Sequence, residues 1–260
     1  MAVPYPQVVL LGDSLFEQSV NLDNGFSFQA ALQTLCIRRL DVVNRGLSGW
    51  NSANVVEHLD RLFPKPTTLS PRIKHLVILL GANDAVIPMP TTTQHVPIDQ
   101  YKTNLQTIIN HPHIRAHEPK ILLVTPPPLD EIKREEVDKA AGHPRTTRTC
   151  AISASYSDKA REVARENPDV TLVDLWQALM NKAIEMAPEH YTPGGPWLGT
   201  RENGHRGGLK ELLSDGLHMS GDAYRVFYDE IKPLILDEWA HLQENDRTGY
   251  LLPDWRTLNC

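Results

Sequence analysis

Five short apolar runs, each followed by a longer segment with helical spacing, constrain the fold of this chain most. The runs are rich in β-branched residues and lie at Val8–Leu11, Asp41–Asn44, His75–Leu80, Lys120–Val124 and Val170–Val173. Runs of this length and composition are typical of strands, whereas apolar residues every three to four positions are typical of amphipathic helices. His75–Leu80 and Lys120–Val124 are apolar on both faces, which favours a parallel sheet covered by helices on each side. The pattern therefore predicts an α/β fold, a three-layer sandwich around a five-stranded parallel sheet.

Helices are predicted between and after these runs, and two irregular stretches separate some of them. The predicted helices lie at Phe26–Arg39, Asn54–Phe63, Ile98–Asn110, Tyr156–Glu166, Leu175–Met186 and Gly221–Leu242. The stretches around residues 126–149 and 188–208 contain prolines and glycines that fix or permit turns, so we interpret them as loop insertions that shape or cover a site. Within the first, the charged run Asp130–Lys139 is typical of a solvated helix face. We expect one domain over residues 1–260, with a C-terminal tail from about 243.

The composition excludes several classes of protein. Of the 260 residues, 41% are hydrophobic and 22% are charged, which excludes a disordered or fibrous chain. The formal net charge of −6 gives no basic field for a nucleic acid or an anionic membrane, and no apolar run reaches the roughly 20 residues that span a bilayer. Three widely spaced cysteines argue against a disulfide framework, and no basic region precedes the first apolar run. We expect a cytoplasmic protein and leave open whether it forms a homo-oligomer.

Polar motifs follow the first three predicted strands. They are GDSLFE at residues 12–17, NRGLSGW at residues 44–50 and GAND at residues 81–84. Because the carboxyl ends of parallel strands share one edge of the sheet, we expect these motifs to meet there, together with DGLH at residues 215–218. A serine becomes a nucleophile when a base takes its proton and an acid orients that base. Ser14, His218 and Asp215 can fill these three roles.

The oxyanion that forms when a serine attacks a carbonyl carbon needs hydrogen-bond donors aimed at it. The backbone N–H groups of Ser14 and Gly49 and the side-chain amide of Asn83 are available from three different strand ends. A glycine at position 49 lets the backbone approach without a clash from a Cβ atom. No dinucleotide-binding or P-loop motif occurs, so the sequence gives no support for a bound nucleotide.

The four motifs, in this order, resemble the motif blocks of the SGNH hydrolases, also called GDSL-type esterases and lipases. Within that family, RGLSGWNS, LGANDA, DGLHMSG and PDWR most resemble the isoamyl acetate-hydrolysing esterases of fungi and their relatives. The resemblance implies a flavodoxin-like fold with Ser14 as nucleophile, His218 as base and Asp215 as the acid that orients this base. It also implies an oxyanion hole formed by Ser14, Gly49 and Asn83, catalysis without a cofactor, and short-chain acyl esters such as acetates as substrates.

Side chains beside the motif residues are candidates for the substrate pocket, and their bulk predicts a small apolar pocket for a small-molecule ester. They are Leu15, Phe16, Trp50, Ala85, Val86, Leu217 and Met219. Deacetylation of a sugar or another acylated metabolite is an alternative, because the same triad serves either leaving group. A catalytically inactive scaffold that binds a small ester or a partner protein is the alternative of another class.

Three further groups of residues have a simpler interpretation than catalysis. Ser48 lacks the GxSxG elbow that a serine nucleophile of an α/β-hydrolase uses. Asp13 is interpreted as a turn residue that satisfies backbone donors. His111, His113 and His117 are interpreted as residues of a polar surface loop, so we expect no metal site there.

Overall fold

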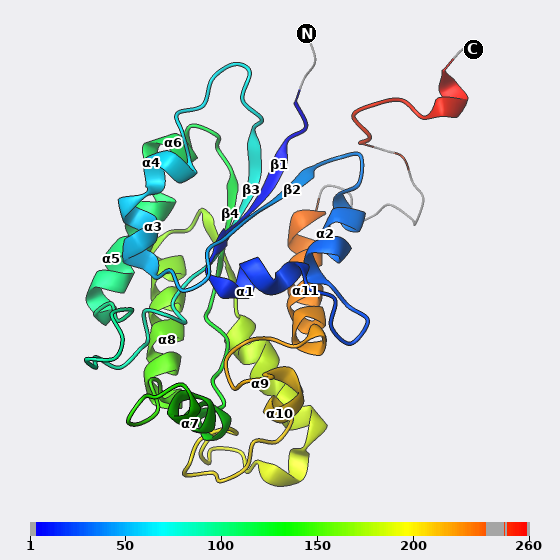
Figure 1. Ribbon diagram of the computed structural model, residues 1–260. Coiled ribbons are helices and arrows are strands. Elements are labelled where there is room, and N and C mark those ends of the chain that lie inside the picture. The colour runs from blue at the N-terminus through cyan, green and yellow to red at the C-terminus, as the bar shows by residue number, and fades with distance from the viewer. Residues whose placement is uncertain (1–3, 238–246, 248, 259–260) are drawn as a thin grey trace.

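The computed structural model describes residues 4–237, 247 and 249–258, and their strands form one parallel sheet. The strand order is β2-β1-β3-β4-β5 (Figure 1). The strands span β1 Gln7–Gly12, β2 Asp41–Gly46, β3 Ile73–Leu79, β4 Lys120–Val124 and β5 Val170–Val173. All five predicted strands are therefore confirmed. Because β1 lies between β2 and β3, successive crossovers leave it in opposite directions, and such a point opens a crevice at the carboxyl ends of the strands.

Helices cover both faces of this sheet, which confirms the three-layer α/β sandwich (Figure 1). One face carries α2 (Phe28–Cys36), α9 (Leu175–Met186) and α11 (Gly221–Ile235), and the other carries α3 (Ser52–Glu57), α4 (Leu59–Leu62), α5 (Ile98–Ile109) and α8 (Cys150–Glu166). Shorter elements complete the chain: α1 (Ser14–Glu17), η1 (Gln18–Val20), α6 (Pro112–Arg115), α7 (Glu131–Ala140), η2 (Pro188–His190), α10 (Leu209–Leu212) and η3 (Trp255–Thr257).

The two faces of the sheet have separate apolar cores. Along β1, Val8 and Leu10 belong to one buried cluster, and Val9 and Leu11 belong to the other. Successive side chains of a strand point to opposite faces, so each strand contributes to both cores. Apart from polar residues near their starts, such as Lys74, His75 and Lys120, the central strands are consequently apolar, as the sequence predicted. The sheet is a rigid support for the loops at its carboxyl edge.

The first insertion, residues 126–149, is more than a loop, because it contains helix α7. The prediction that the charged residues of this helix face solvent is wrong for two of them. The Asp138 side chain is fully buried, and that of Arg134 is only 12% exposed. Both turn inward, where each has polar partners that replace water. In the second insertion, residues 188–208, Leu198 is fully buried in the core that includes α9.

The end of the chain packs on the turn that follows α2. Helix α11 ends at Ile235, and residues 238–242 of the predicted last helix lie outside the described residues. Further on, Leu251 N donates to Arg38 O at 3.0 Å, and Arg38 Nη2 donates to Pro253 O at 2.9 Å. The described part of the tail is thus tied to the body of the protein. Within the residues that are described, we find no helix long and apolar enough to cross a membrane.

Candidate active site

Ser14 lies at the sharp turn between β1 and α1. Asp13 precedes it as the N-cap of α1, and an Asp13 carboxylate oxygen accepts a hydrogen bond from Leu15 N at 2.8 Å. Gly12 is required just before this turn, since a Cβ atom there would lie 2.4 Å from Leu79 O on the neighbouring strand. The turn therefore brings the Ser14 hydroxyl to the carboxyl edge of the sheet, where it is only 9% exposed.

Ser14, His218 and Asp215 form a continuous chain of hydrogen-bonding groups. Ser14 Oγ lies 2.9 Å from His218 Nε2, and His218 Nδ1 lies 2.9 Å from Asp215 Oδ2. The three residues come from the turn after β1 and from the loop before α11, 204 residues apart in the case of Ser14 and His218. With the proton on Nδ1 held by the carboxylate, Nε2 is free to accept the proton of the serine hydroxyl.

Asp215 is held as a carboxylate by its surroundings. Its Oδ1 accepts hydrogen bonds from Leu217 N at 3.0 Å and His218 N at 2.8 Å, while its Oδ2 also accepts one from Arg134 Nη1 at 3.0 Å. Burial by itself raises the pKa of Asp215, but the hydrogen bonds from the His218 side chain and backbone and from Leu217 N outweigh it and hold the pKa well below its ordinary value. The carboxylate therefore stays charged opposite the imidazole.

Donors for an oxyanion surround Ser14 Oγ from three loops. Gly49 lies in the turn after β2 with φ at +80°, a conformation that strongly favours glycine, and it lines the same cavity as Ser14. Asn83 follows β3, and its Nδ2 donates to Trp50 O at 2.8 Å, which leaves its second N–H for a ligand. The Ser14 N–H belongs to the first turn of α1 and is not needed by the helix ladder. The structure thus brings Ser14, Gly49 and Asn83 to one cavity.

The cavity beside Ser14 has a volume of about 330 Å³ and is polar. Its charged lining residues are Arg134, Asp138 and Arg148, and its uncharged polar ones include Gln18, Ser48, Thr92, Gln94, His143 and Thr147. Within the part of the chain that the structure describes, Leu217 is the one apolar side chain of this lining. The predicted apolar pocket is therefore wrong in character.

Most of the predicted pocket residues lie elsewhere. Leu15, Phe16, Ala85, Val86 and Met219 are at most 6% exposed and belong to the core or its edge, and they are absent from the cavity lining. Leu15, Phe16 and Met219 belong to one buried apolar cluster, and Ala85 belongs to the other. The Trp50 ring packs against His58 with ring centroids 5.0 Å apart, so only its carbonyl oxygen touches the site, through Asn83.

Sequence reasoning missed four polar residues that lie around the cavity. Arg134 and Asp138 come from α7, and Thr147 and Arg148 come from the segment that leads into α8. A signal was present: the insertion after β4 begins at the carboxyl edge of the sheet, so its charged residues are candidates for the site. Ser48 also lines the cavity, but the His218 imidazole is hydrogen-bonded to Ser14. The Ser48 N–H donates to Glu17 Oε2 at 2.7 Å.

The three predicted loop histidines have different surroundings in the structure. His117 is buried, and its Nδ1 accepts a hydrogen bond from Ile73 N. Asp60, His111 and His113 each offer one ligand atom, and these atoms all lie within 4.8 Å of one another. His113 Nδ1 is already 2.8 Å from Phe63 O, and the Asp60 side chain is 79% exposed. These two features weaken the group as a place for a metal ion.

Comparison with known proteins agrees with this geometry. The model of the GDSL-like lipase/acylhydrolase family matches residues 10–226. The chain belongs to this family. The matched part includes Ser14, Gly49, Asn83, Asp215 and His218, and membership makes the chain a carboxylic ester hydrolase.

Curated members of the GDSL family match almost the whole chain. A GDSL esterase/lipase of Arabidopsis thaliana is 30% identical over 239 residues, which cover 89% of this chain and 86% of that protein. The human isoamyl acetate-hydrolyzing esterase 1 homolog is 28% identical over 264 residues, which cover 99% of this chain and 90% of that protein. The resemblance inferred from the motifs is thereby confirmed.

The solved structures of an esterase and of an acylhydrolase share the fold. The crystal structure of the acetyl xylan esterase AlAXEase has a TM-score of 0.62 at 18% identity and covers 88% of this chain and 99% of that one. The lipase/acylhydrolase from Enterococcus faecalis has a TM-score of 0.59 at 20% identity, with coverage of 90% and 96%. At these identities the likeness extends to the α/β fold alone.

Proposed function

We propose that this GDSL hydrolase cleaves short-chain acyl esters, such as acetate esters, through an acyl-serine intermediate. The observation that carries the proposal is the hydrogen-bonded chain from Ser14 Oγ to Asp215, with both links at 2.9 Å. A binding scaffold has no need of a carboxylate that orients a base against a hydroxyl. The cavity of about 330 Å³ is at the low end of small-molecule sites, which supports a short ester.

In the proposed mechanism, Ser14 Oγ attacks the ester carbonyl carbon while His218 Nε2 takes the hydroxyl proton. The C–O bond to the alcohol weakens as the carbonyl oxygen becomes an oxyanion, which accepts hydrogen bonds from the Ser14 and Gly49 N–H groups and Asn83 Nδ2. His218 then gives its proton to the leaving alcohol. Water, deprotonated by the same imidazole, then attacks the carbonyl carbon of the acyl-serine. The bond from this carbon to Ser14 Oγ breaks, His218 returns the proton to Oγ, and the carboxylic acid is released.

Covalent labelling tests this proposal. A fluorophosphonate should add to Ser14 Oγ, because the His218 imidazole, itself paired with Asp215, can take the proton of that hydroxyl. We expect mass spectrometry to find one label on the Ser14 peptide of the wild type and none on the Ser14→Ala variant. Ser48→Ala is the matched control, since Ser48 lines the same cavity, and it should label normally. An unlabelled wild-type chain would favour the inactive scaffold.

The polar cavity favours a second candidate, an ester whose alcohol part carries several hydroxyl groups, as in an acetylated sugar. Hydroxyl and amide groups such as those of Thr92 and Gln94 can exchange hydrogen bonds with a polyol, and Leu217 provides little apolar surface. An alkyl alcohol would instead displace water from these polar groups without replacing its hydrogen bonds, which lowers its relative kcat/KM.

Kinetics with matched esters separate the two candidates. We expect an acetylated sugar to have a kcat/KM at least about 10-fold above that of isoamyl acetate, since one or more polar groups stay paired. Isoamyl acetate and p-nitrophenyl esters of increasing acyl length provide the apolar series. If isoamyl acetate has the higher kcat/KM instead, the polar alcohol is excluded while the esterase chemistry stands.

We also propose that the protein works in the cytoplasm. Support comes from Cys36 and Cys150, which are free thiols among the described residues. Burial raises the pKa of both thiols to about 12, so neither is reactive.

A further inference from the structure

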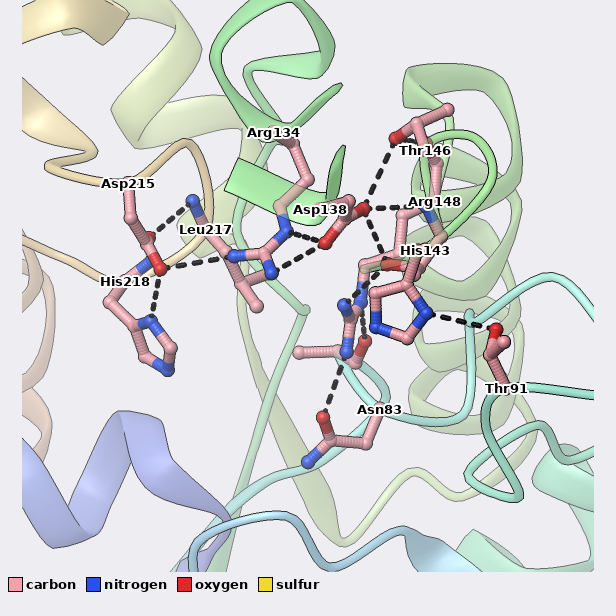
Figure 2. A network of polar contacts seen from close by, with 12 residues as sticks. Asn83, Thr91, Arg134, Asp138, His143, Thr146, Arg148, Asp215, Leu217 and His218 are labelled. Carbon is pink, nitrogen blue, oxygen red and sulfur yellow. Dashed lines mark hydrogen bonds and ion pairs between the residues drawn. The ribbon is translucent and has the colours of Figure 1, made fainter. Parts of the chain in front are cut away.

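The first insertion connects the acid of the triad with residues across the cavity (Figure 2). Arg134, on α7, donates to Asp215 Oδ2 through Nη1 at 3.0 Å. Its Nε and Nη2 bind Asp138 Oδ1 at 2.7 and 2.6 Å. Gly216, with φ at +86°, makes this approach possible, since a Cβ atom there would lie 2.8 Å from Arg134 N. One guanidinium group therefore bridges the triad carboxylate and a fully buried carboxylate.

Asp138 in turn hydrogen-bonds to Thr147, in the segment before α8. Its Oδ2 accepts hydrogen bonds from Thr147 N at 2.5 Å and Thr147 Oγ1 at 2.7 Å. Burial raises the pKa of Asp138, but the bonds from Arg134 and Thr147 outweigh it and hold the pKa below its ordinary value. Thr147 Oγ1 in turn accepts a hydrogen bond from Arg148 Nη1 at 3.1 Å.

Arg148 fixes the other end of this network. Its side chain is almost completely buried, and its three nitrogens are directed at three acceptors. Nε donates to Ala82 O at 2.8 Å, Nη1 to Thr147 Oγ1, and Nη2 to Asn83 Oδ1 at 3.0 Å. A guanidinium group presents its donors in a rigid fork, so these contacts hold it in one place. The position of the guanidinium is thereby set by the turn that follows β3 and, through Thr147 and Asp138, by α7.

The contact between Arg148 and Asn83 determines which way the Asn83 amide faces. A guanidinium group offers donors only, so the atom of Asn83 that faces it must be the oxygen. The nitrogen then faces the Trp50 carbonyl and the cavity, as the bond from Nδ2 to Trp50 O at 2.8 Å shows. A flipped amide would turn its oxygen toward the developing oxyanion and would leave buried donors facing each other.

We propose that Arg148 is a positioning residue that keeps the Asn83 amide turned toward the oxyanion, anchored through Thr147 and Asp138 to the same guanidinium that holds Asp215. The inference rests on the proposed function, because it assumes that Asn83 donates to the oxyanion. It extends that function by assigning the insertion after β4 a part in turnover. The substrate does not touch Arg148 in this role, so the residue acts on kcat through Asn83.

A double-mutant cycle tests the inference on the full chain with p-nitrophenyl acetate. Asn83→Ala should lower kcat by about 10²–10³-fold, the usual cost of a lost oxyanion donor. Arg148→Met should lower kcat by about 10- to 100-fold with KM within about 2-fold of wild type, because the amide then rotates while its donor remains. In the Asn83→Ala background, Arg148→Met should change kcat by less than about 2-fold.

Further variants keep the test independent of folding. Arg165→Met is the matched control, since Arg165 is exposed on α8, and it should retain wild-type kcat. If Arg148→Met does not fold, Arg148→Gln replaces it. A glutamine amide offers both a donor and an acceptor, so it no longer selects the oxygen of Asn83, and its kcat should also fall by at least about 10-fold with KM unchanged.

Three results would overturn the positioning role. Equal effects of Arg148→Met in both backgrounds would show that Arg148 acts independently of Asn83. An effect on KM alone would show that Arg148 binds substrate. Full kcat in Asn83→Ala would instead remove Asn83 from the oxyanion hole of the proposed function. Loss in Asn83→Ala without loss in the Arg148 variants would reject the positioning role alone.

Discussion

Asp215→Asn is expected to lower kcat by about 10⁴-fold, because it reverses the tautomer of the catalytic imidazole. The Leu217 and His218 N–H groups both donate to Asp215 Oδ1, so an asparagine oxygen will stay on that side. The amide nitrogen then replaces Oδ2 and faces His218 Nδ1. Since it can only donate, Nδ1 must give up its proton and Nε2 must carry one. A protonated Nε2 cannot accept the Ser14 proton.

Steady-state hydrolysis of p-nitrophenyl acetate measures this loss. Asp158→Asn is a suitable control, because the Asp158 side chain on α8 is 73% exposed, and this variant should keep wild-type kcat. Asp215→Asn also removes the acceptor of Arg134 Nη1, so thermal unfolding must show that both variants are folded. A folded Asp215→Asn chain with less than a 10-fold loss would mean that the carboxylate does not set the tautomer.

The fold could be predicted from sequence because its signals are local. Strands β3 and β4 are buried on both faces, and such runs are recognisable by their uniform apolar content. The candidate site could be predicted for a related reason: Ser14, Gly49 and Asn83 each lie in a turn that follows a strand, and parallel strands bring their carboxyl ends together. Asp215 and His218 are close in sequence, so a single turn is enough to pair them.

The lining of the cavity could not be predicted, because it depends on which way neighbouring side chains face. Leu15 directly follows Ser14 in sequence, yet it is turned into the core. Arg134 and Arg148, in contrast, are far from every motif along the chain and reach the site only because α7 packs back over the sheet edge. A charged helix in an insertion usually faces water, and nothing in its composition indicates that Asp138 is fully buried.

Asp13, beside the nucleophile, is the second residue for which we expect a large effect, here on stability. Its side chain is fully buried, and among the described residues no hydrogen-bond partner is present for its Oδ2. Burial raises the pKa of Asp13 from 3.8 to about 7, with a smaller contribution from the Asp84 carboxylate and an opposing one from the Leu15 N–H. The folded chain therefore holds a proton on Asp13 over a range of pH in which the unfolded chain has lost it.

The contribution of Asp13 to the free energy of unfolding should consequently fall as the pH rises from about 4 to about 7, and this contribution should be absent from Asp13→Asn. Burial also raises the pKa of Asp84, to about 6, and its contribution is present in both chains. The raised pKa of Asp13 corresponds to a change of about 4 kcal/mol across this window, taken as an upper limit. Urea unfolding of both chains from pH 4 to 8 measures it, with Asp158→Asn as the exposed control. Asparagine adds a buried amide donor, but that cost is independent of pH. The decisive quantity is therefore the slope of the difference between the two chains, and parallel curves would show that Asp13 has the same pKa in the folded and the unfolded chain.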